Sequence, residues 1–554
     1  MRYRNKIKNR NSLELLLLLA FAVLFRLFLL KYQFEVGWDE ANYLILARAF
    51  AQGNWQAALH PYWSPMFSVC IALFSFVFSD FALSARMVSL VAGVLVLLPV
   101  YFFAKEVFNH KIAIISAALL AVFPPIAFYS TSAWSESTYM AFSVFGIYFG
   151  WKTVKKKSVL QGFVTGILFG LAYLTKPEGI GYFAVYLAIL LILLVVRPKR
   201  RKHFGSWALI PFYILGFVLM SAPYVLFLHQ STGQWTLSSK VLANQQFEAN
   251  YYTDEAYDFN SLNSDNTQMP MDMIFHEGNF LELVHKQQQP TQSIGLGLLV
   301  KKYSKNLFQL LKKDIPALFG VILGILAVLG LFGKGWSKQA VPINGYLLSY
   351  VIFFWLCVVP LFHINDRYLL SGFVLCFVWM GKGVVLWFEW MTDVLKKLNS
   401  PKVQHYYKSL AIVFVASMIF LLGYLPETAK IVARDRGTDY FWAEAPELKK
   451  AGLWIRSQEK SSPVIMSYNK AVDYYSGCSD IKLSVSFPSN PIDRIVKYAI
   501  NKNVDYIVVS QRYLTAFPNL APFFQDEELP SDLILVYEDL EDTGLGVRIF
   551  QVQK

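Results

Sequence analysis

Cysteine and charged residues are both scarce in this sequence. Only four of the 554 residues are cysteines, and Asp, Glu, Lys and Arg together make up 16%. The cysteines lack the paired spacing of a disulfide framework or a zinc site; they are Cys70, Cys357, Cys376 and Cys478. Hydrophobic residues make up 55% of the chain, which is more than soluble proteins usually carry. The composition therefore excludes a disulfide-rich secreted domain and indicates an integral membrane protein.

Positive charge exceeds negative charge, and the formal net charge is +13. The basic residues fall in short clusters between apolar segments, for example at 2–10, 152–157 and 197–202. This distribution is typical of the cytoplasmic loops of a polytopic membrane protein, whereas a nucleic-acid-binding face would carry a continuous basic surface. We therefore expect no nucleic-acid partner.

A helix needs about 17 to 25 mostly apolar residues to cross a bilayer. Eleven segments of about this length are present, near 13–31, 84–103, 112–129, 137–151, 159–175, 179–196, 207–228, 315–333, 341–361, 368–389 and 408–425. A twelfth apolar stretch, residues 65–79, is shorter. If it crossed, the basic clusters at 152–157 and 197–202 would face the side opposite to the basic N-terminus, against the positive-inside rule. We predict that it lies along the outer interface, with a cytoplasmic N-terminus and an outer C-terminus in the plasma (inner) membrane.

This topology divides the chain into four expected regions. Residues 1–228 form a transmembrane module with the first outer loop, and residues 229–314 form a large outer loop. The basic amphipathic end of that loop, KKYSKNLFQLLKK, can rest on the membrane surface. Residues 315–425 hold the last transmembrane helices. Residues 426–554 combine strand-like stretches (PVIMSY, DYIVVS, LILVYED, VRIFQV) with two amphipathic helices, which predicts an extracytoplasmic α/β domain.

The expected fold is thus a polytopic α-helical membrane protein with about 11 transmembrane helices, outer interfacial helices and a small C-terminal soluble α/β domain. Charged residues at the predicted outer ends of the spans are then the candidates for chemistry. Asp39 and Glu40 lie side by side in VGWDEANYLILARAF, where the chain leaves its first span.

Two interpretations of this acidic pair stay open. Asp39 can cap the helix that follows, with Glu40 as a solvated neighbour. That helix is expected to lie flat on the outer surface, because its apolar residues fall on one face. Alternatively, an ionised carboxylate held at the interface can act as a general base on a lipid-borne substrate.

Further charged residues are predicted on the same outer face. Glu136 follows the third span in AWSESTYMAF, and Lys176 and Glu178 lie in the turn LTKPEGIGY. They can be a helix cap and ordinary turn charges. Alternatively, two carboxylates near one interface, Asp39 and Glu136, can bind sugar hydroxyls, hold a divalent cation or share the role of general base.

Two arginines complete the set. Arg86 lies in DFALSARM at the outer end of the second span, and Arg367 precedes Tyr368 in HINDRYLL at the outer end of the tenth. A guanidinium group offers planar donors that fit a phosphate, or it can extend toward lipid headgroups. His276 and His285, in the second outer loop, have no spacing typical of metal ligands.

The order of these motifs resembles the C-type glycosyltransferases of the protein O-mannosyltransferase and lipid A aminoarabinose transferase superfamily. The motifs are the outer DE pair, HPYWSPMF, SARMVSLVAG, the SES loop, LTKPEG and RYLL. The resemblance covers about residues 10–230 and, more loosely, 360–375. It implies that Asp39 is catalytic and that Glu136 contributes to the same site. Relatives of the aminoarabinose type have a lysine before the proline of the interfacial segment, whereas this chain has Ser64 there.

The resemblance also implies a polyprenyl-phosphate sugar as donor and a hydroxyl of a protein, lipid or polysaccharide as acceptor, alongside membrane lipids. Asp39 would deprotonate the acceptor, and in-line displacement would invert the anomeric carbon. The remaining charged candidates and the adjoining tyrosine are then substrate-binding: Glu40, Arg86, Lys176, Glu178, Arg367 and Tyr368. No cofactor is specified, and a divalent cation stays open.

The alternative function is a transporter or flippase of a lipid-linked glycan. Such a protein is expected to carry ionisable or helix-breaking groups near the membrane midplane. Here the charges gather at the outer ends of the spans, and Arg26 is the main exception. A third interpretation is an assembly protein that only binds partners, for which replacing the Asp39 carboxylate by an amide would have no effect.

Overall fold

The computed structural model describes residues 2–33, 36–196, 204–240, 296–338, 340–361, 366–395, 401–429 and 445–553, apart from 459, 461, 486, 488–490, 516, 526–528 and 541–544. The chain divides into two compact units. Unit 1 comprises Met1–Gln33, Arg86–Pro223 and Leu296–Val432, and unit 2 comprises Phe34–Ala85, Tyr224–Gly295 and Ala433–Lys554. His276 and His285 lie outside the described residues.

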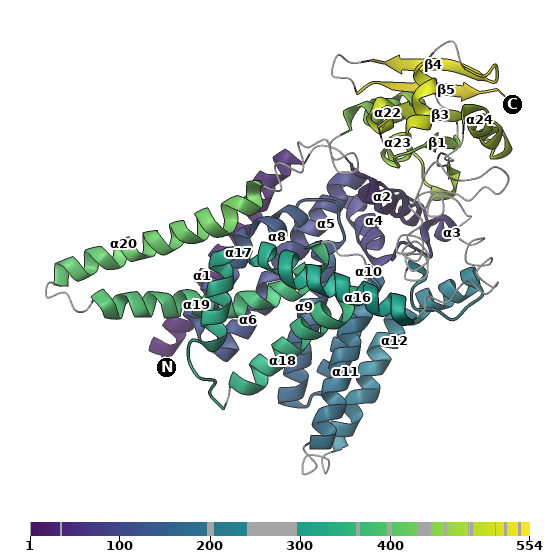
Figure 1. Ribbon diagram of the computed structural model, residues 1–554. Coiled ribbons are helices and arrows are strands. Elements are labelled where there is room, and N and C mark those ends of the chain that lie inside the picture. Colours follow the sequence, from purple (N-terminus) through teal and green to yellow (C-terminus); the bar gives the residue numbers. More distant parts are fainter. Residues whose placement is uncertain are drawn as a thin grey trace. The chain divides into compact units, whose positions relative to one another are not determined.

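Unit 1 is helical (Figure 1). Its helices are α1 (Arg2–Leu29), α6 (Leu97–Val107), α7 (His110–Val122), α8 (Pro124–Tyr129), α9 (Glu136–Lys156), α10 (Val159–Thr175), α11 (Gly179–Val196), α16 (Leu296–Gln309), α17 (Ile315–Phe332), α18 (Ala340–Ile352), α19 (Leu370–Leu395) and α20 (Pro401–Ile419). Two helices contain residues of both units, α5 (Phe81–Leu95) and α12 (Phe204–Thr232). Short 3₁₀ or π turns join several of these helices, including η4 (Phe353–Val358) and η6 (Asp366–Leu369).

Seven helical segments in the described part of the chain are long and apolar enough to cross a membrane. They are Arg10–Tyr32, Phe81–Val107, Ala208–Thr232, Leu299–Phe332, Ala340–Leu361, Arg367–Val394 and Ser409–Ala429. Three more predicted spans correspond to shorter apolar helices, His110–Val122, Val159–Thr175 and Gly179–Val195, and the fourth lies in α9. The polytopic helical fold is confirmed, and the number of eleven crossings stays a prediction.

Close helix packing in unit 1 depends on glycine. Helix α17 packs along α19. A Cβ atom added at Gly330 of α17 would lie 1.7 Å from the carbonyl oxygen of Trp379, and one added at Gly383 of α19 would lie 2.0 Å from that of Leu326. Small residues that let two backbones touch are typical of helix pairs in lipid, where hydrophobic burial alone does not drive association.

Arg26, the main charge that the sequence places inside a span, has partners in the structure. Arg26 of α1 is fully buried, and its Nη1 donates to the carbonyl oxygens of Ala22 (3.2 Å) and Ala121 (3.1 Å). Ala121 lies in the last turn of α7, whose final carbonyls have no partner within the helix. A cation at this negative end of the helix is stabilising. Arg26 therefore joins α1 to α7, as part of the fold.

Unit 2 contains the segment that is predicted to form the first outer loop. Its helices are α2 (Trp38–Ala51), α3 (Trp55–Ala58) and α4 (Met66–Phe78). Helix α4 has 13 residues and is therefore about 20 Å long. Because α7, a predicted span, has the same length, the interfacial place of α4 stays a prediction. Helix α2 packs on α4, and all its residues from 41 to 47 are buried. The expectation of a single buried apolar face on α2 is therefore wrong.

The C-terminal part of unit 2 is an α/β domain, as predicted (Figure 1). Its five strands are β1 (Ile465–Ser467), β2 (Ser484–Val485), β3 (Tyr506–Ser510), β4 (Leu533–Asp539) and β5 (Val547–Val552), in the order β2-β1-β3-β5-β4. β1 runs parallel to β2 and β3, and β5 is antiparallel to β3 and β4. The helices are α22 (Pro446–Ser457), α23 (Ala471–Tyr475) and α24 (Ile492–Asn501). β2 and α23 were not predicted, because segments of two and five residues carry no periodic signal.

Candidate active site

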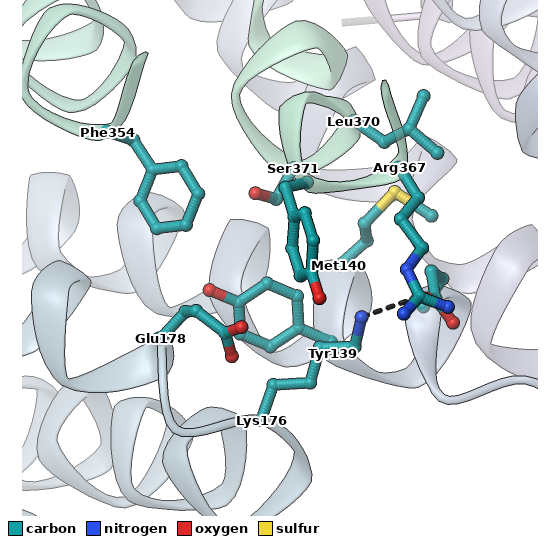
Figure 2. Close-up of a pocket in the computed structure, with 10 residues that line it drawn as sticks. Tyr139, Met140, Lys176, Glu178, Phe354, Arg367, Leu370 and Ser371 are labelled. Carbon is teal, nitrogen blue, oxygen red and sulfur yellow. Dashed lines mark hydrogen bonds and ion pairs between the residues drawn. The ribbon is translucent and has the colours of Figure 1, made fainter. Parts of the chain in front are cut away.

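One pocket of unit 1 gathers five of the eight residues that the sequence singled out. Its lining is Glu136, Tyr139, Met140, Lys176, Glu178, Phe354, Arg367, Tyr368, Leu370 and Ser371. These residues come from α9, the turn between α10 and α11, η4, η6 and the start of α19. In Figure 2 the amino group of Lys176 and the guanidinium group of Arg367 lie near each other, and the dashed line marks the ion pair of Lys176 with Glu136.

Local backbone chemistry places these side chains. Helix α10 ends at Thr175 because Lys176 is extended (φ −147°, ψ 135°), as is usual for a residue before proline. Helix α11 then starts at Gly179, where an added Cβ atom would lie 2.4 Å from the backbone nitrogen of Tyr173. The tight turn thus requires glycine and carries Lys176 and Glu178 to the same end of the helix pair.

Glu136 is the centre of the charge arrangement. Its side chain is buried, and its Oε1 lies 2.5 Å from Nζ of Lys176 and 3.9 Å from Nε of Arg367. Two nearby cations favour the ionised carboxylate even though burial opposes it. In the described part of the chain, no hydrogen-bond donor reaches its second oxygen, Oε2. Among the described residues, no donor reaches Oε2 of Glu178 either. Both acids can therefore accept hydrogen bonds from a ligand.

Aromatic rings hold the two cations in place. Nζ of Lys176 lies 5.4 Å from the ring centre of Tyr368 and 6.0 Å from that of Tyr139. The guanidinium group of Arg367 lies 4.8 Å from the ring centre of Trp134 and 5.3 Å from that of Tyr368. Such contacts are favourable for cations that are partly removed from water.

The pocket is small. Its cavity volume is about 10 Å³, room for about one water molecule. A sugar phosphate therefore requires side-chain movement before it can enter, and the ion pair between Lys176 and Glu136 is one contact that such a ligand would replace.

The acidic pair of Asp39 and Glu40 belongs to unit 2. Helix α2 starts at Trp38 with Gly37 as its N-cap, and the Gly37 amide donates to Oε2 of Glu40 at 2.9 Å. The capping acid is therefore Glu40, and the interpretation of Asp39 as the cap is wrong. Glu40 is also buried, with 6% of its surface exposed, so it is not a solvated neighbour. An acid three residues after the N-cap is half of a capping box, a signal the sequence did contain.

Asp39 is partly exposed, and its catalytic role stays a prediction. Arg86 does not line the pocket in unit 1; its Nη1 donates to the carbonyl oxygen of Gln33 at 3.0 Å. The predicted contact of Arg86 with substrate therefore stays a prediction. Tyr139, Met140, Phe354 and Ser371 were missed, because inside apolar segments they look like ordinary core residues.

The described ranges contain no group of three or more His, Cys, Asp and Glu side chains that could hold a metal ion. Within the pocket, the two carboxylates of Glu136 and Glu178 are accompanied by the two cations of Lys176 and Arg367. The arrangement can bind a group that combines negative charge with hydroxyls, because it offers charged donors beside acceptor oxygens.

Comparison with known proteins extends this picture. The family model of the dolichyl-phosphate-mannose-protein mannosyltransferases matches residues 60–226, a range that includes Glu136, Lys176 and Glu178 but not Asp39. A search of curated protein sequences found no significant match.

Two kinds of solved structure are similar in fold. The oligosaccharyltransferase of Archaeoglobus fulgidus in its apo form has a TM-score of 0.53 and 13% identity, over 90% of this chain and 70% of that one. ArnT of Cupriavidus metallidurans bound to undecaprenyl phosphate has a TM-score of 0.53 and 16% identity, over 96% and 97%. The apo state of ArnT has a TM-score of 0.50 and 15% identity, over 96% of this chain and 97% of that one. This chain is thus similar to the dolichyl-phosphate-mannose-protein mannosyltransferases over residues 60–226, and it shares its fold with the oligosaccharyltransferase and ArnT.

Proposed function

We propose that the chain is a membrane glycosyltransferase that moves a sugar from a polyprenyl-phosphate carrier to an acceptor hydroxyl on the outer face of the membrane. The observation that carries the proposal is the pocket in which Glu136 is ion-paired with Lys176 and approached by Arg367. The lipid bound to ArnT, undecaprenyl phosphate, supports the choice of carrier class. The sugar and the acceptor (protein, lipid or polysaccharide) stay unassigned.

The pocket supplies the donor side of the reaction. Lys176 and Arg367 bind the carrier phosphate and stabilise the negative charge that moves onto it as the bond to the sugar breaks. Glu136 keeps both cations in place, and its free oxygen, with that of Glu178, accepts hydrogen bonds from sugar hydroxyls. Tyr368 supports both cations through its ring.

Asp39 is proposed as the base. It removes the proton from the acceptor hydroxyl while that oxygen forms a bond to the anomeric carbon. The electron pair of the broken bond leaves with the phosphate, which is a good leaving group and needs little acid assistance. Attack opposite the leaving group inverts the anomeric carbon.

The proposal includes a topology. Residues 1–228 are the catalytic module, 229–314 the large outer loop, 315–425 the last spans and 426–554 an extracytoplasmic domain. The N-terminus is cytoplasmic and the membrane is the plasma (inner) membrane. The charge pattern of the loops supports this orientation.

The test uses the purified full chain in lipid nanodiscs with polyprenyl-phosphate mannose, the sugar of the matching family, and then with other polyprenyl-phosphate sugars. Mass spectrometry measures the polyprenyl phosphate that is released when an acceptor or water takes the sugar. Asp39→Asn should lower kcat by about 10²–10⁴-fold, and the protein should stay folded because the amide has the same size. Full activity in folded Asp39→Asn would contradict the assignment of the base.

The same assay separates the alternative function. A flippase moves the lipid-linked glycan without releasing polyprenyl phosphate, so transport without release would favour it. The structure offers that alternative no specific support, because the buried charge of Arg26 is explained by its contact with α7.

A further inference from the structure

Helix α2, which carries Asp39, is held at its end by the C-terminal domain of the same unit. Arg48, in the last turn of α2, donates from Nη1 to the carbonyl oxygen of Cys478 and from Nη2 to that of Tyr474 at 3.3 Å. Its guanidinium group also lies 5.1 Å from the ring centre of Tyr474 and 5.6 Å from that of Phe81. One half-buried side chain thus makes four contacts, of which three are with residues 474–478.

A second contact holds the start of the helix. The amide of Val36 donates to the hydroxyl oxygen of Tyr475 at 3.2 Å, and Val36 is buried. Val36 immediately precedes Gly37, the N-cap of α2, and lies three residues before Asp39. Asp39 therefore lies between two attachments to one short helix, α23.

The form of α23 explains why it can receive Arg48. The helix ends in a turn in which Gly477 has φ +94°, a conformation that favours glycine. In this turn the carbonyl oxygen of Tyr474 accepts from the Gly477 amide at 3.2 Å, and its second lone pair accepts from Arg48. Arginine suits this place because its planar fork reaches two acceptors at once.

Helix α23 is in turn fixed to the C-terminal sheet. At Gly452 of α22, an added Cβ atom would lie 2.6 Å from Cβ of Tyr475, so the two helices touch directly. Helix α22 contacts β3 and β5. A displacement of the sheet would therefore be passed to α23 and to both attachments of α2.

The carboxyl end of β1, where an α/β domain often binds a ligand, is filled by the protein's own side chains. Ser467 donates to Oδ2 of Asp473 at 3.1 Å, and Lys470 donates to Ser484. All four residues are buried. This end of the sheet leads directly into α23, so its polar groups support the helix that contacts α2.

We propose that the C-terminal domain is a positioning module for Asp39, and that Arg48 and Tyr475 are the positioning residues through which it acts. The proposal deepens the proposed function and rests on the role of Asp39 as base. It assigns to residues 445–553 the task of fixing α2, with no substrate contact of their own.

The test compares Arg48→Ala and Tyr475→Phe with the control Arg494→Ala, a change of an exposed arginine on α24 of the same domain. Hydrogen exchange is measured on residues 36–48 in the full chain in nanodiscs, together with kinetics on polyprenyl-phosphate mannose. In Arg48→Ala, exchange at these amides should rise by tenfold or more, because two charged hydrogen bonds are lost. Tyr475→Phe removes one hydroxyl and should speed exchange a few-fold near residues 36–40 only.

The kinetic readout distinguishes positioning from general damage. Arg48→Ala should lower kcat at least tenfold while the donor KM changes less than twofold, because the donor contacts come from other helices. Unchanged exchange in Arg48→Ala would overturn the attachment of α2. Faster exchange with wild-type kcat would overturn the positioning role. If Asp39→Asn stays active, the proposed base is wrong, and the exchange data still decide the attachment.

Discussion

Replacing Arg367 by alanine tests the donor side of the proposal. Only 15% of its side chain is exposed, and it lies between the rings of Trp134 and Tyr368. A charged hydrogen bond in such a place contributes about 1.5–3 kcal/mol. Each 1.4 kcal/mol corresponds to a factor of ten, so Arg367→Ala should lower kcat/KM for the donor by about 10- to 150-fold.

The loss should divide between the two kinetic constants. Arg367 contacts the phosphate before and during the reaction, so the donor KM should rise. Because negative charge moves onto the phosphate as the bond breaks, the contact strengthens in the transition state, and kcat should fall as well. Asp39→Asn should instead lower chiefly kcat.

Two further variants sharpen the interpretation. Arg367→Lys keeps the charge but loses the planar fork and the fit between two rings, so it should recover only part of the activity. The control is Lys334→Ala, which breaks an exposed ion pair with Glu389 (2.9 Å). Such pairs contribute about 0–1 kcal/mol, so the control should be close to wild type. If isothermal titration with polyprenyl-phosphate mannose shows unchanged binding in Arg367→Ala, the phosphate contact is wrong and Arg86 becomes the better candidate.

Other parts of the chain allow equally direct tests. Glu40→Ala removes a helix cap and should lower the free energy of unfolding by about 0.5–2 kcal/mol, whereas Glu40→Gln keeps an acceptor oxygen and should behave like wild type in a thermal melt. An impermeant thiol reagent on intact cells should label Cys478 from outside. Because this thiol is buried, labelling is expected only once the domain is denatured. A tag at residue 154 should stay protected from protease, and the reverse result in both experiments would invert the topology. Arg512 and Glu447 form a buried ion pair (2.7 Å). Arg512→Ala should therefore destabilise the C-terminal domain by about 3–5 kcal/mol in chemical unfolding. A loss below about 1 kcal/mol would show that the remaining carboxylate of Glu447 is solvated.

The sequence was most informative where a feature repeats over many residues. Long apolar runs predicted helices that the structure contains, and strand-like stretches predicted β1, β3, β4 and β5. The same reasoning grouped Glu136, Lys176, Glu178, Arg367 and Tyr368 at one end of the spans. That grouping alone did not decide the pocket, because Arg86 was predicted at the same end and instead donates to the carbonyl oxygen of Gln33.

Features that depend on a single contact could not be predicted from the sequence. Glu40 is the capping acid because it accepts a hydrogen bond from the Gly37 amide, and its capping-box signal can be recognised only once the first residue of the helix is known. The contact of Arg48 with Tyr474 joins residues more than 400 positions apart, and α23 is too short for a periodic pattern. Such contacts are set by tertiary packing, which a local pattern does not encode.

The arrangement of Glu136 has a consequence for how the donor would enter. A buried carboxylate paired with Lys176 at 2.5 Å stabilises both charges while the pocket is closed, since an uncompensated charge there would be costly. An arriving phosphate brings its own negative charge to the same cations, so Glu136 loses part of its pairing as the donor binds. Its free oxygen can recover this loss only from a donor group such as a sugar hydroxyl. The pocket should therefore favour a phosphate that carries a sugar over the bare polyprenyl phosphate, which helps the product to leave.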